Sequence, residues 1–209
     1  MSASQRDFAV LGGSFDPVHQ GHISIAETIS DYLGTTVRLV PVGVPAHKSR
    51  LVASPKQRLK MLELATLNQP SLVVDDRELV RESVSYTFET LCSFRDQLGE
   101  SENLYFVLGM DAYLDLPSWH EWQSLLNVAH IIVCRRASAK TLPPALQLFE
   151  QAYRVRSMDE LKAAPCGFVY YVENAAVEVS SSEVRARLWR DDSVTGMINP
   201  EGARFISGQ

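Results

Sequence analysis

Two histidines three residues apart, His19 and His22, stand where an apolar helical pattern begins. Residues at positions i and i+3 share one face of a helix, so both imidazoles should point the same way. Near pH 7 each ring can donate a hydrogen bond or carry a proton. The pair follows Gly12-Gly13, a turn after the apolar run 8–11, which predicts a buried strand. Such a strand, turn and helix start favour a phosphate, because the first helix N–H groups lack partners and the helix dipole attracts anions.

Other interpretations of this segment stay open. Two glycines after a strand can be only a tight turn, and His-x-x-His spacing can also ligate zinc. No further His or Cys lies close by in the sequence, so a local metal site would have two protein ligands at most. The segment is also neither G-x-x-x-x-G-K-[ST] nor G-x-G-x-x-G, the two familiar phosphate loops.

A second candidate phosphate element lies near the C-terminus. Three hydroxyls, those of Ser180, Ser181 and Ser182, stand at a predicted helix start, and Arg185 follows one turn later. A plain capping box of Ser180 with Glu183 is the structural alternative. Three hydroxyls and a guanidinium are more than a cap needs, and Arg185 can bind a phosphate as a charged fork.

Further candidates follow predicted strands, at the sheet edge where ligands of parallel sheets bind. His47 and Lys48 could donate to a second phosphate, although a surface loop is the ordinary interpretation. Gly109 would let a flat ring approach closely, and Asp111 can accept from ribose hydroxyls or cap a helix. Arg135, the first of two arginines after a strand, could contact phosphate or be simply solvated.

Two segments carry aromatic residues near predicted helix starts. One is Ser85-Tyr86-Thr87, and the other contains Trp119 and Trp122. The two tryptophans would share one face of a helix predicted over 118–127, where either could pack in the core or stack on an aromatic ring.

Apolar periodicity predicts strands that alternate with helices along the whole chain. Strands spaced in this way form right-handed βαβ units, so we predict an α/β class with a Rossmann-like three-layer α/β/α fold and a mainly parallel sheet. We expect a single domain over 1–209, whose C-terminal helices from about residue 180 carry the serine and arginine element. Beyond the first strand and helix, the predicted strands are 36–42, 72–74, 103–109, 129–134 and 167–172, the helices 58–67 after a Ser54-Pro55 cap, 87–98, 118–127, 180–189 and 200–206, and the surface loop 137–144.

Composition excludes several classes of protein. A hydrophobic content of 45% and a charged content of 22% are typical of soluble globular proteins. A net charge of −5 argues against a nucleic-acid partner, and no apolar run is long enough to cross a bilayer. The first residues lack an apolar signal core, and the three scattered cysteines fit reduced thiols, so we expect a cytoplasmic protein. No oligomeric state is indicated.

The segment from Gly12 to His22 resembles GG-[ST]-F-DP-x-H-x-GH, the signature of the HxGH nucleotidylyltransferases, almost letter for letter. The segment 179–185 resembles their element [IV]-S-[ST]-[ST]-x-[IV]-R, with Ser182 where threonine is more usual. In that superfamily the two histidines contact the phosphates of ATP or CTP. The resemblance implies an ATP site made of Gly12, Gly13, Ser14, Phe15, His19, His22, Gly109, Asp111, Arg135, Ser180, Ser181, Ser182 and Arg185, with His19, His22, Lys48 and Arg185 catalytic.

The SYT and LPxW segments, with P-x-HK, G-x-D and CRR, narrow the resemblance to the bacterial nicotinate mononucleotide adenylyltransferases. It covers nearly the whole chain, from Phe8 to about Ile206. It implies transfer of the adenylyl group of ATP to nicotinate mononucleotide, giving nicotinate adenine dinucleotide and pyrophosphate, a step of NAD biosynthesis. The residues implied in binding the mononucleotide are His47, Lys48, Ser85, Tyr86, Thr87, Trp119 and Trp122.

The implied chemistry needs neither a protein nucleophile nor a strong base, since the attacking phosphate is already an anion. Catalysis would be positioning and stabilisation of charge. We expect Mg²⁺ to arrive with ATP, because no carboxylate cluster suggests a protein metal site. Two alternatives are another HxGH enzyme, such as phosphopantetheine adenylyltransferase, and a non-catalytic nucleotide sensor. The SYT and LPxW segments argue against the first, and retention of both histidines and Arg185 argues against the second.

Overall fold

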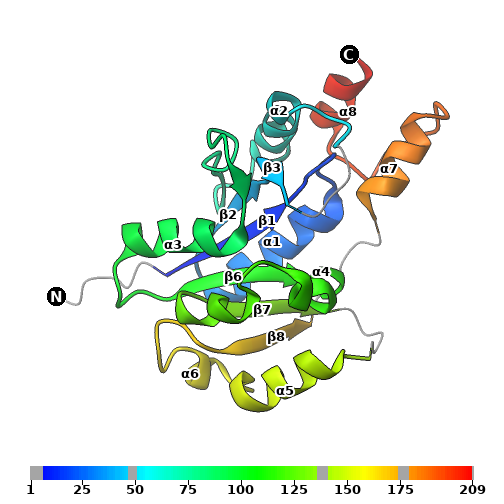
Figure 1. The fold of residues 1–209 in the computed structure, drawn as a ribbon. Helices are drawn as coiled ribbons and strands as arrows, with labels where there is room; N and C mark the ends of the chain where they lie inside the picture. Colours follow the sequence, from blue (N-terminus) through cyan, green and yellow to red (C-terminus); the bar gives the residue numbers. More distant parts are fainter. Residues whose placement is uncertain (1–6, 47–50, 136–140, 174–178, 209) are drawn as a thin grey trace. The chain divides into compact units, whose positions relative to one another are not determined.

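The computed structural model describes residues 7–46, 51–135, 141–173 and 179–208 (Figure 1). The chain divides into two units, each built from two separate segments. Unit 1 comprises Met1–Gly12 and Tyr86–Ala175, and unit 2 comprises Gly13–Ser85 and Ala176–Gln209.

Unit 1 contains a parallel sheet whose strands lie in the order β1, β6, β7, β8. Its register places Phe106 opposite both Val10 and Ile131. The first five residues of β6 and of β7 are all buried, which explains their continuous apolar runs, since strands covered on both faces do not alternate. The strands are β1 (Phe8–Gly13), β6 (Leu104–Gly109), β7 (His130–Arg135) and β8 (Val169–Glu173), and the helices are α3 (Thr87–Leu98), α4 (Met110–Asp115), α5 (Pro144–Tyr153) and α6 (Met158–Leu161), with 3₁₀ turns η1 (Leu116–Ser118) and η2 (Trp122–Asn127).

Unit 2 contains the parallel pair β2 and β4 and a second parallel pair, β3 and β5. Gly34, in the left-handed conformation at φ 67°, ends the first helix, and Ser54 caps the second with Pro55 at its first position. The strands are β2 (Thr36–Pro41), β3 (Val44–Pro45), β4 (Leu72–Val74) and β5 (Val84–Ser85), and the helices are α1 (Gln20–Leu33), α2 (Pro55–Thr66), α7 (Ser181–Leu188) and α8 (Pro200–Ser207).

The C-terminal part of unit 2 has a small apolar core of its own. Val184 of α7 packs with Val194, Met197 and Ile198, which lie between α7 and α8. Asn199 caps α8 by accepting from the N–H of Gly202 at 2.6 Å, and its amide donates to the carbonyl of Leu64 at 2.9 Å. These contacts anchor the segment that carries the serine and arginine element.

The α/β class and the parallel pairing are confirmed, and the predicted strands agree with β1, β2, β4, β6, β7 and β8 to within about two residues. The helix predicted over 118–127 is wrong. η1 and η2 are short 3₁₀ turns, separated by Trp119 in an extended conformation and Glu121 in the left-handed one. Burial of Leu125 and Leu126 directs the chain here, and tertiary packing overrides weak helix propensity.

Half of the predicted loop, residues 137–140, lies outside the described residues, but Pro144 begins α5 rather than ending a loop. A proline at the first helical position is a start signal, because its missing N–H would have no partner there. Helices α4, α5 and α6 and strands β3 and β5 were not predicted from the sequence. Within the described ranges, no helix has the length and apolar character needed to span a membrane.

Candidate functional site

His19 and His22 form a stacked pair at the start of α1. Their ring centroids are 3.7 Å apart and their planes differ by 25°. His19 is the N-cap residue, and its backbone N–H donates to Nδ1 of His22 at 3.3 Å. Because Nδ1 accepts this bond, a neutral His22 ring carries its proton on Nε2 and can donate it to an anion. The prediction that the two rings lie together is confirmed.

Phe15 supports His22 from the preceding turn. Its fully buried ring meets the His22 ring edge-on, with centroids 4.9 Å apart. Its backbone has φ 46°, which is uncommon for a residue with a side chain. Because the ring is fully buried, any contact of Phe15 with a ligand would be made by its backbone.

The turn predicted at Gly12 and Gly13 begins later in the chain, because both glycines are the last residues of β1. Neither Gly12 nor Gly13 has positive φ. A Cβ on Gly13 would lie 3.1 Å from the ring of Phe15, so this glycine makes room for a side chain of the same loop.

Two N–H groups at the start of α1 already have partners. The N–H of Gln20 donates to the carbonyl of Met197 at 2.7 Å, and that of His22 donates to the carbonyl of His19 at 2.9 Å. The expectation that the first helix N–H groups lack partners is wrong for these two: the C-terminal segment of unit 2 provides the acceptor for Gln20, and a local turn at His19 provides the acceptor for His22. A phosphate bound at this helix start would depend more on side chains than the sequence implied.

The two predicted phosphate elements meet within unit 2. Arg185 donates through Nη1 to the carbonyl of Asp16 and through Nη2 to Oγ of Ser182 at 3.2 Å. The hydroxyl of Ser181 donates to the carbonyl of Pro17 at 3.0 Å. Residues far apart in the sequence thus fix the same loop, the one that ends at His19.

Ser180 has the role that the structural alternative assigned to it. It is the N-cap of α7, and its hydroxyl accepts from the N–H of Glu183 at 3.1 Å. The three serines therefore divide their contacts: Ser180 caps the helix, Ser181 binds the loop, and Ser182 contacts the guanidinium.

In unit 1 the two aromatic segments also meet. Tyr86 is the N-cap residue of α3, Thr87 is its first residue, and the ring of Tyr86 lies 4.3 Å from the ring of His120. His120 was not predicted as a site residue, although its place beside Trp119 in the LPxW segment is a signal that could have found it.

The two tryptophans have different surroundings, so the shared helix face expected for them does not exist. The ring of Trp119 lies 6.3 Å from Phe106 of β6, and that of Trp122 lies 4.9 Å from Phe149 of α5. Both are half-buried. Packing on α5 gives Trp122 a core role, which favours Trp119 as the ring that meets a ligand.

The remaining candidates of unit 1 lie at strand ends, as predicted. Gly109 ends β6 and caps α4, and among the described residues a Cβ there would have no neighbour within 4 Å. Asp111 is exposed in the first turn of α4. Arg135 ends β7, pairs with Glu173 at 2.6 Å and lies over the ring of Tyr171 at 5.1 Å.

His47 and Lys48 lie outside the described residues, but the strand before them does not. In β3, Pro45 is paired with Ser85 of β5, so the P-x-HK and SYT segments begin side by side in unit 2. A Cβ on Gly43 would lie 2.0 Å from the carbonyl of Glu78, so only glycine allows this approach.

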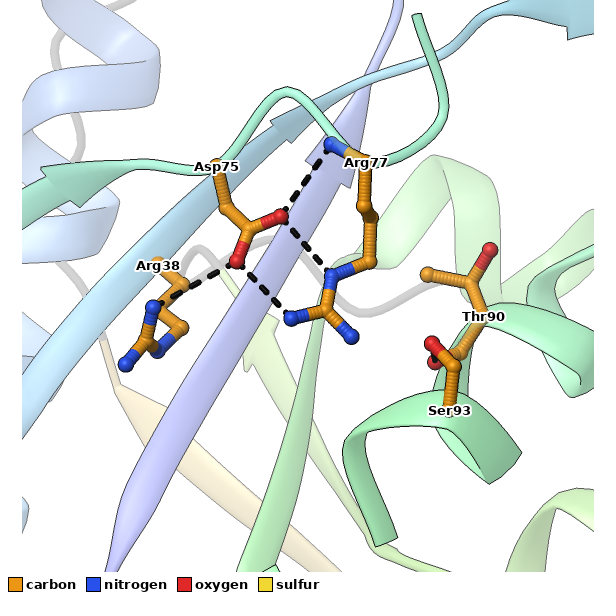
Figure 2. Close-up of polar contacts among 5 residues, drawn as sticks. All are labelled: Arg38, Asp75, Arg77, Thr90 and Ser93. Atoms are coloured by element: carbon orange, nitrogen blue, oxygen red, sulfur yellow. Dashed lines mark hydrogen bonds and ion pairs between the residues drawn. The ribbon is translucent and has the colours of Figure 1, made fainter. Parts of the chain in front are cut away.

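A charged cluster fixes the segment after β4 (Figure 2). Arg77 donates to both carboxylate oxygens of Asp75, at 2.8 and 3.0 Å, and Arg38 of β2 lies 3.4 Å from one of them. Burial raises the pKa of Asp75, but the hydrogen bonds from Arg77 and the charges of both arginines outweigh it, so the pKa lies below its usual value. This cluster had not been predicted.

Comparison with known proteins defines the class first. The family model of cytidylyltransferase-like proteins matches residues 10–187, which places the chain among these nucleotidyltransferases. A solved structure, Plasmodium falciparum nicotinic acid mononucleotide adenylyltransferase complexed with NaAD, has a TM-score of 0.73 and 21% identity, with 97% of this chain and 95% of that chain covered. This likeness confirms the Rossmann-like α/β fold.

Closer relatives define the family. A protein of Yersinia enterocolitica named "Probable nicotinate-nucleotide adenylyltransferase" is 38% identical over 205 residues, which are 97% of this chain and 93% of the relative. A protein of the same name from Yersinia pestis is 36% identical, with the same coverage. The chain belongs to the nicotinate-nucleotide adenylyltransferase family.

Proposed function

We propose that this protein transfers the adenylyl group of ATP to nicotinate mononucleotide and releases pyrophosphate, a step of NAD biosynthesis. The observation that carries the proposal is the meeting of two motifs in unit 2, where Arg185 and Ser181 hydrogen-bond the loop that leads to His19. Relatives over nearly the whole chain carry the same activity in their name.

In the reaction, a phosphate oxygen of nicotinate mononucleotide attacks the α-phosphorus of ATP. The bond from that phosphorus to the bridging oxygen breaks, and pyrophosphate leaves with the electron pair. Negative charge grows on the α-phosphate and on the leaving group. The Nε2–H of His22 and the guanidinium of Arg185 suit this charge, because preorganised donors stabilise it without reorganisation.

We propose that unit 2 binds the triphosphate through the loop 13–22 and the element 180–185, with Lys48 and His47 as additional donors. In unit 1, we propose that Gly109 and Asp111 bind the adenosine and Arg135 a phosphate. Thr87 and Trp119 would bind the nicotinate nucleotide, with Tyr86 beside them and Trp122 as a supporting ring that packs on α5, and in unit 2 Ser85 is a further candidate for this nucleotide. We also propose that the two units act as one nucleotidylyltransferase domain.

The nucleotide substrate is expected as its Mg²⁺ complex, in which the ion neutralises phosphate charge. Within the described parts of the chain, no group of three or more His, Cys, Asp or Glu side chains is arranged to hold a metal. We propose a cytoplasmic enzyme with neither a nucleic-acid nor a membrane partner, on the grounds of net charge −5 and scattered cysteines.

The direct test is to incubate the protein with MgATP and, separately, nicotinate mononucleotide, nicotinamide mononucleotide or phosphopantetheine, and to measure pyrophosphate and the adenylylated product. We expect turnover with the first acceptor. Selectivity over the amide should be on the order of a hundredfold in kcat/KM, since an amide NH₂ facing buried donors leaves groups unpaired at about 1–3 kcal/mol each. Turnover with phosphopantetheine alone, or ATP binding without turnover, would support the two alternatives.

A further inference from the structure

Arg58, on α2, is a fully buried cation outside the set of predicted site residues. Its Nη1 donates to the carbonyl of Ser14 at 3.0 Å. Arg58 interacts electrostatically with two carboxylates that are themselves almost fully buried, those of Asp16 and Glu78. Burial lowers the pKa of Arg58 and these carboxylates raise it, and a guanidinium stays charged throughout the physiological range.

Asp16 provides a second connection between the same loop and the same helix. Its carboxylate accepts from the backbone N–H of Val52 at 2.8 Å and from that of Ala53 at 2.9 Å. These residues directly precede Ser54, the N-cap of α2. The loop is thus held to α2 through the carbonyl of Ser14 and the carboxylate of Asp16, on either side of Phe15.

The bond to Ser14 determines where the neighbouring N–H points. In a trans peptide the C=O and the following N–H point in opposite directions. Since the Ser14 carbonyl faces Arg58, the N–H of Phe15 is directed away from Arg58. The next torsion is the left-handed φ of Phe15, which carries its ring to the edge of His22.

Stability alone does not account for a buried arginine here. Taking a guanidinium out of water is costly, and the nearby charges of Asp16 and Glu78 offset only part of this cost. Nε of Arg58 has no hydrogen-bond acceptor among the described residues, which adds to the cost. Arg58 also compensates the charges of Asp16 and Glu78, but a lysine would supply the same charge, so charge alone does not require the guanidinium that reaches the Ser14 carbonyl.

We propose that Arg58 is a positioning residue for adenylyl transfer: it orients the Ser14–Phe15 peptide as a fixed donor to a phosphate of ATP and keeps the His22 ring in place. This inference rests on the proposed function. Arg58 would not contact the substrate, and it would act on the transition state through Ser14 and Phe15.

The test compares Arg58→Lys and Arg58→Met with Lys60→Met, a matched control on the exposed face of α2, where Lys60 pairs with Glu63. We expect kcat to fall by roughly ten- to a hundredfold in Arg58→Lys, the scale of a small misplacement of reacting groups. KM for nicotinate mononucleotide and the melting temperature should stay near wild type. If Arg58→Met does not fold, Arg58→Lys, which keeps the charge, carries the test.

A second readout does not depend on turnover. In the ligand-free protein, the imidazole NMR resonances of His22 should shift in Arg58→Lys and stay unchanged in Lys60→Met. Unchanged kcat, or a fall in melting temperature with normal kcat per folded molecule, would overturn the proposal. A wild type inactive with every acceptor would instead refute the proposed function, and the His22 resonances would still decide whether Arg58 holds that ring.

Discussion

In unit 2 the loop that leads to the paired histidines is held by hydrogen bonds to three of its backbone carbonyls. Arg58 donates to the carbonyl of Ser14. Arg185 donates to that of Asp16, and Ser181 to that of Pro17. In unit 1 two candidate residues for the nicotinate nucleotide lie against other rings, Tyr86 against His120 and Trp119 near Phe106.

The difference suits two tasks. Hydrogen bonds are directional, so they can hold donors at the places where charge develops in a transition state. Ring contacts tolerate small shifts and suit recognition of a flat base. We therefore expect changes in the unit 2 loop to lower kcat and changes in the unit 1 rings to raise KM.

The largest expected effect is on His22. The change His22→Ala removes the Nε2–H donor and should lower kcat by roughly a hundredfold or more, about 2.7 kcal/mol, the scale of losing one preorganised donor. The fold should stay intact, as judged by circular dichroism and melting temperature. Near-normal turnover would contradict a role of this ring at the α-phosphate.

A histidine in unit 1 provides a contrast to that pair. His130 is fully buried, donates through Nε2 to the carbonyl of Ala164 at 2.9 Å and accepts at Nδ1 from the N–H of Phe168 at 3.2 Å. Burial, with the charge of Arg95, lowers the pKa of His130 to about 4, against the raising effect of the bond to Ala164. An unfolded histidine titrates near pH 6.5, so between pH 6.5 and 4 the unfolded chain binds more protons and stability falls as pH is lowered.

At pH 5 this linkage should destabilise the wild type by about 2 kcal/mol relative to pH 7. In His130→Gln the amide can make both hydrogen bonds without titrating. The fall in free energy of unfolding between pH 7 and pH 5 should therefore be smaller in this variant than in the wild type, by about the same amount. Urea unfolding of both proteins at the two pH values measures the difference. An equal fall in the free energy of unfolding at pH 5 in both proteins would show that His130 is not the titrating group.

A smaller effect is expected from Arg185→Lys. Lysine loses the fork that donates to both Asp16 and Ser182, so kcat/KM for ATP should fall about tenfold, or about 1.4 kcal/mol. The melting temperature should change little. Arg187→Lys, on the exposed side of the same helix, is the control. A collapse of the melting temperature in Arg185→Lys alone would assign Arg185 a structural role.

The smallest expected effect is in unit 1. Trp119→Ala should raise KM for nicotinate mononucleotide several-fold, because ring stacking contributes about 1 kcal/mol. The preference for nicotinate over nicotinamide should persist, since stacking serves both rings alike. Trp189, which is 88% exposed, provides the control Trp189→Ala. A loss of kcat with unchanged KM in Trp119→Ala would break the distinction between the two units.

Local signals in the sequence were sufficient for much of the fold and for the motifs. The strands β1, β6 and β7 are continuous apolar runs. The pair Ser54-Pro55 marks the start of α2, with the serine as N-cap and the proline at the first helical position. The spacing of His19 and His22 likewise predicted their shared orientation, because three residues make nearly one helical turn.

Only the tertiary structure decided the hydrogen bonds between residues that are far apart in the sequence. The Gln20 N–H is taken by the Met197 carbonyl, and Arg58 reaches Ser14, although neither pair leaves a local signal. The 3₁₀ turns around Trp119 follow from the burial of Leu125 and Leu126. Periodicity and capping report energies within one or two turns of chain, whereas a buried hydrogen bond depends on which backbone groups the completed fold brings within 3 Å of each other.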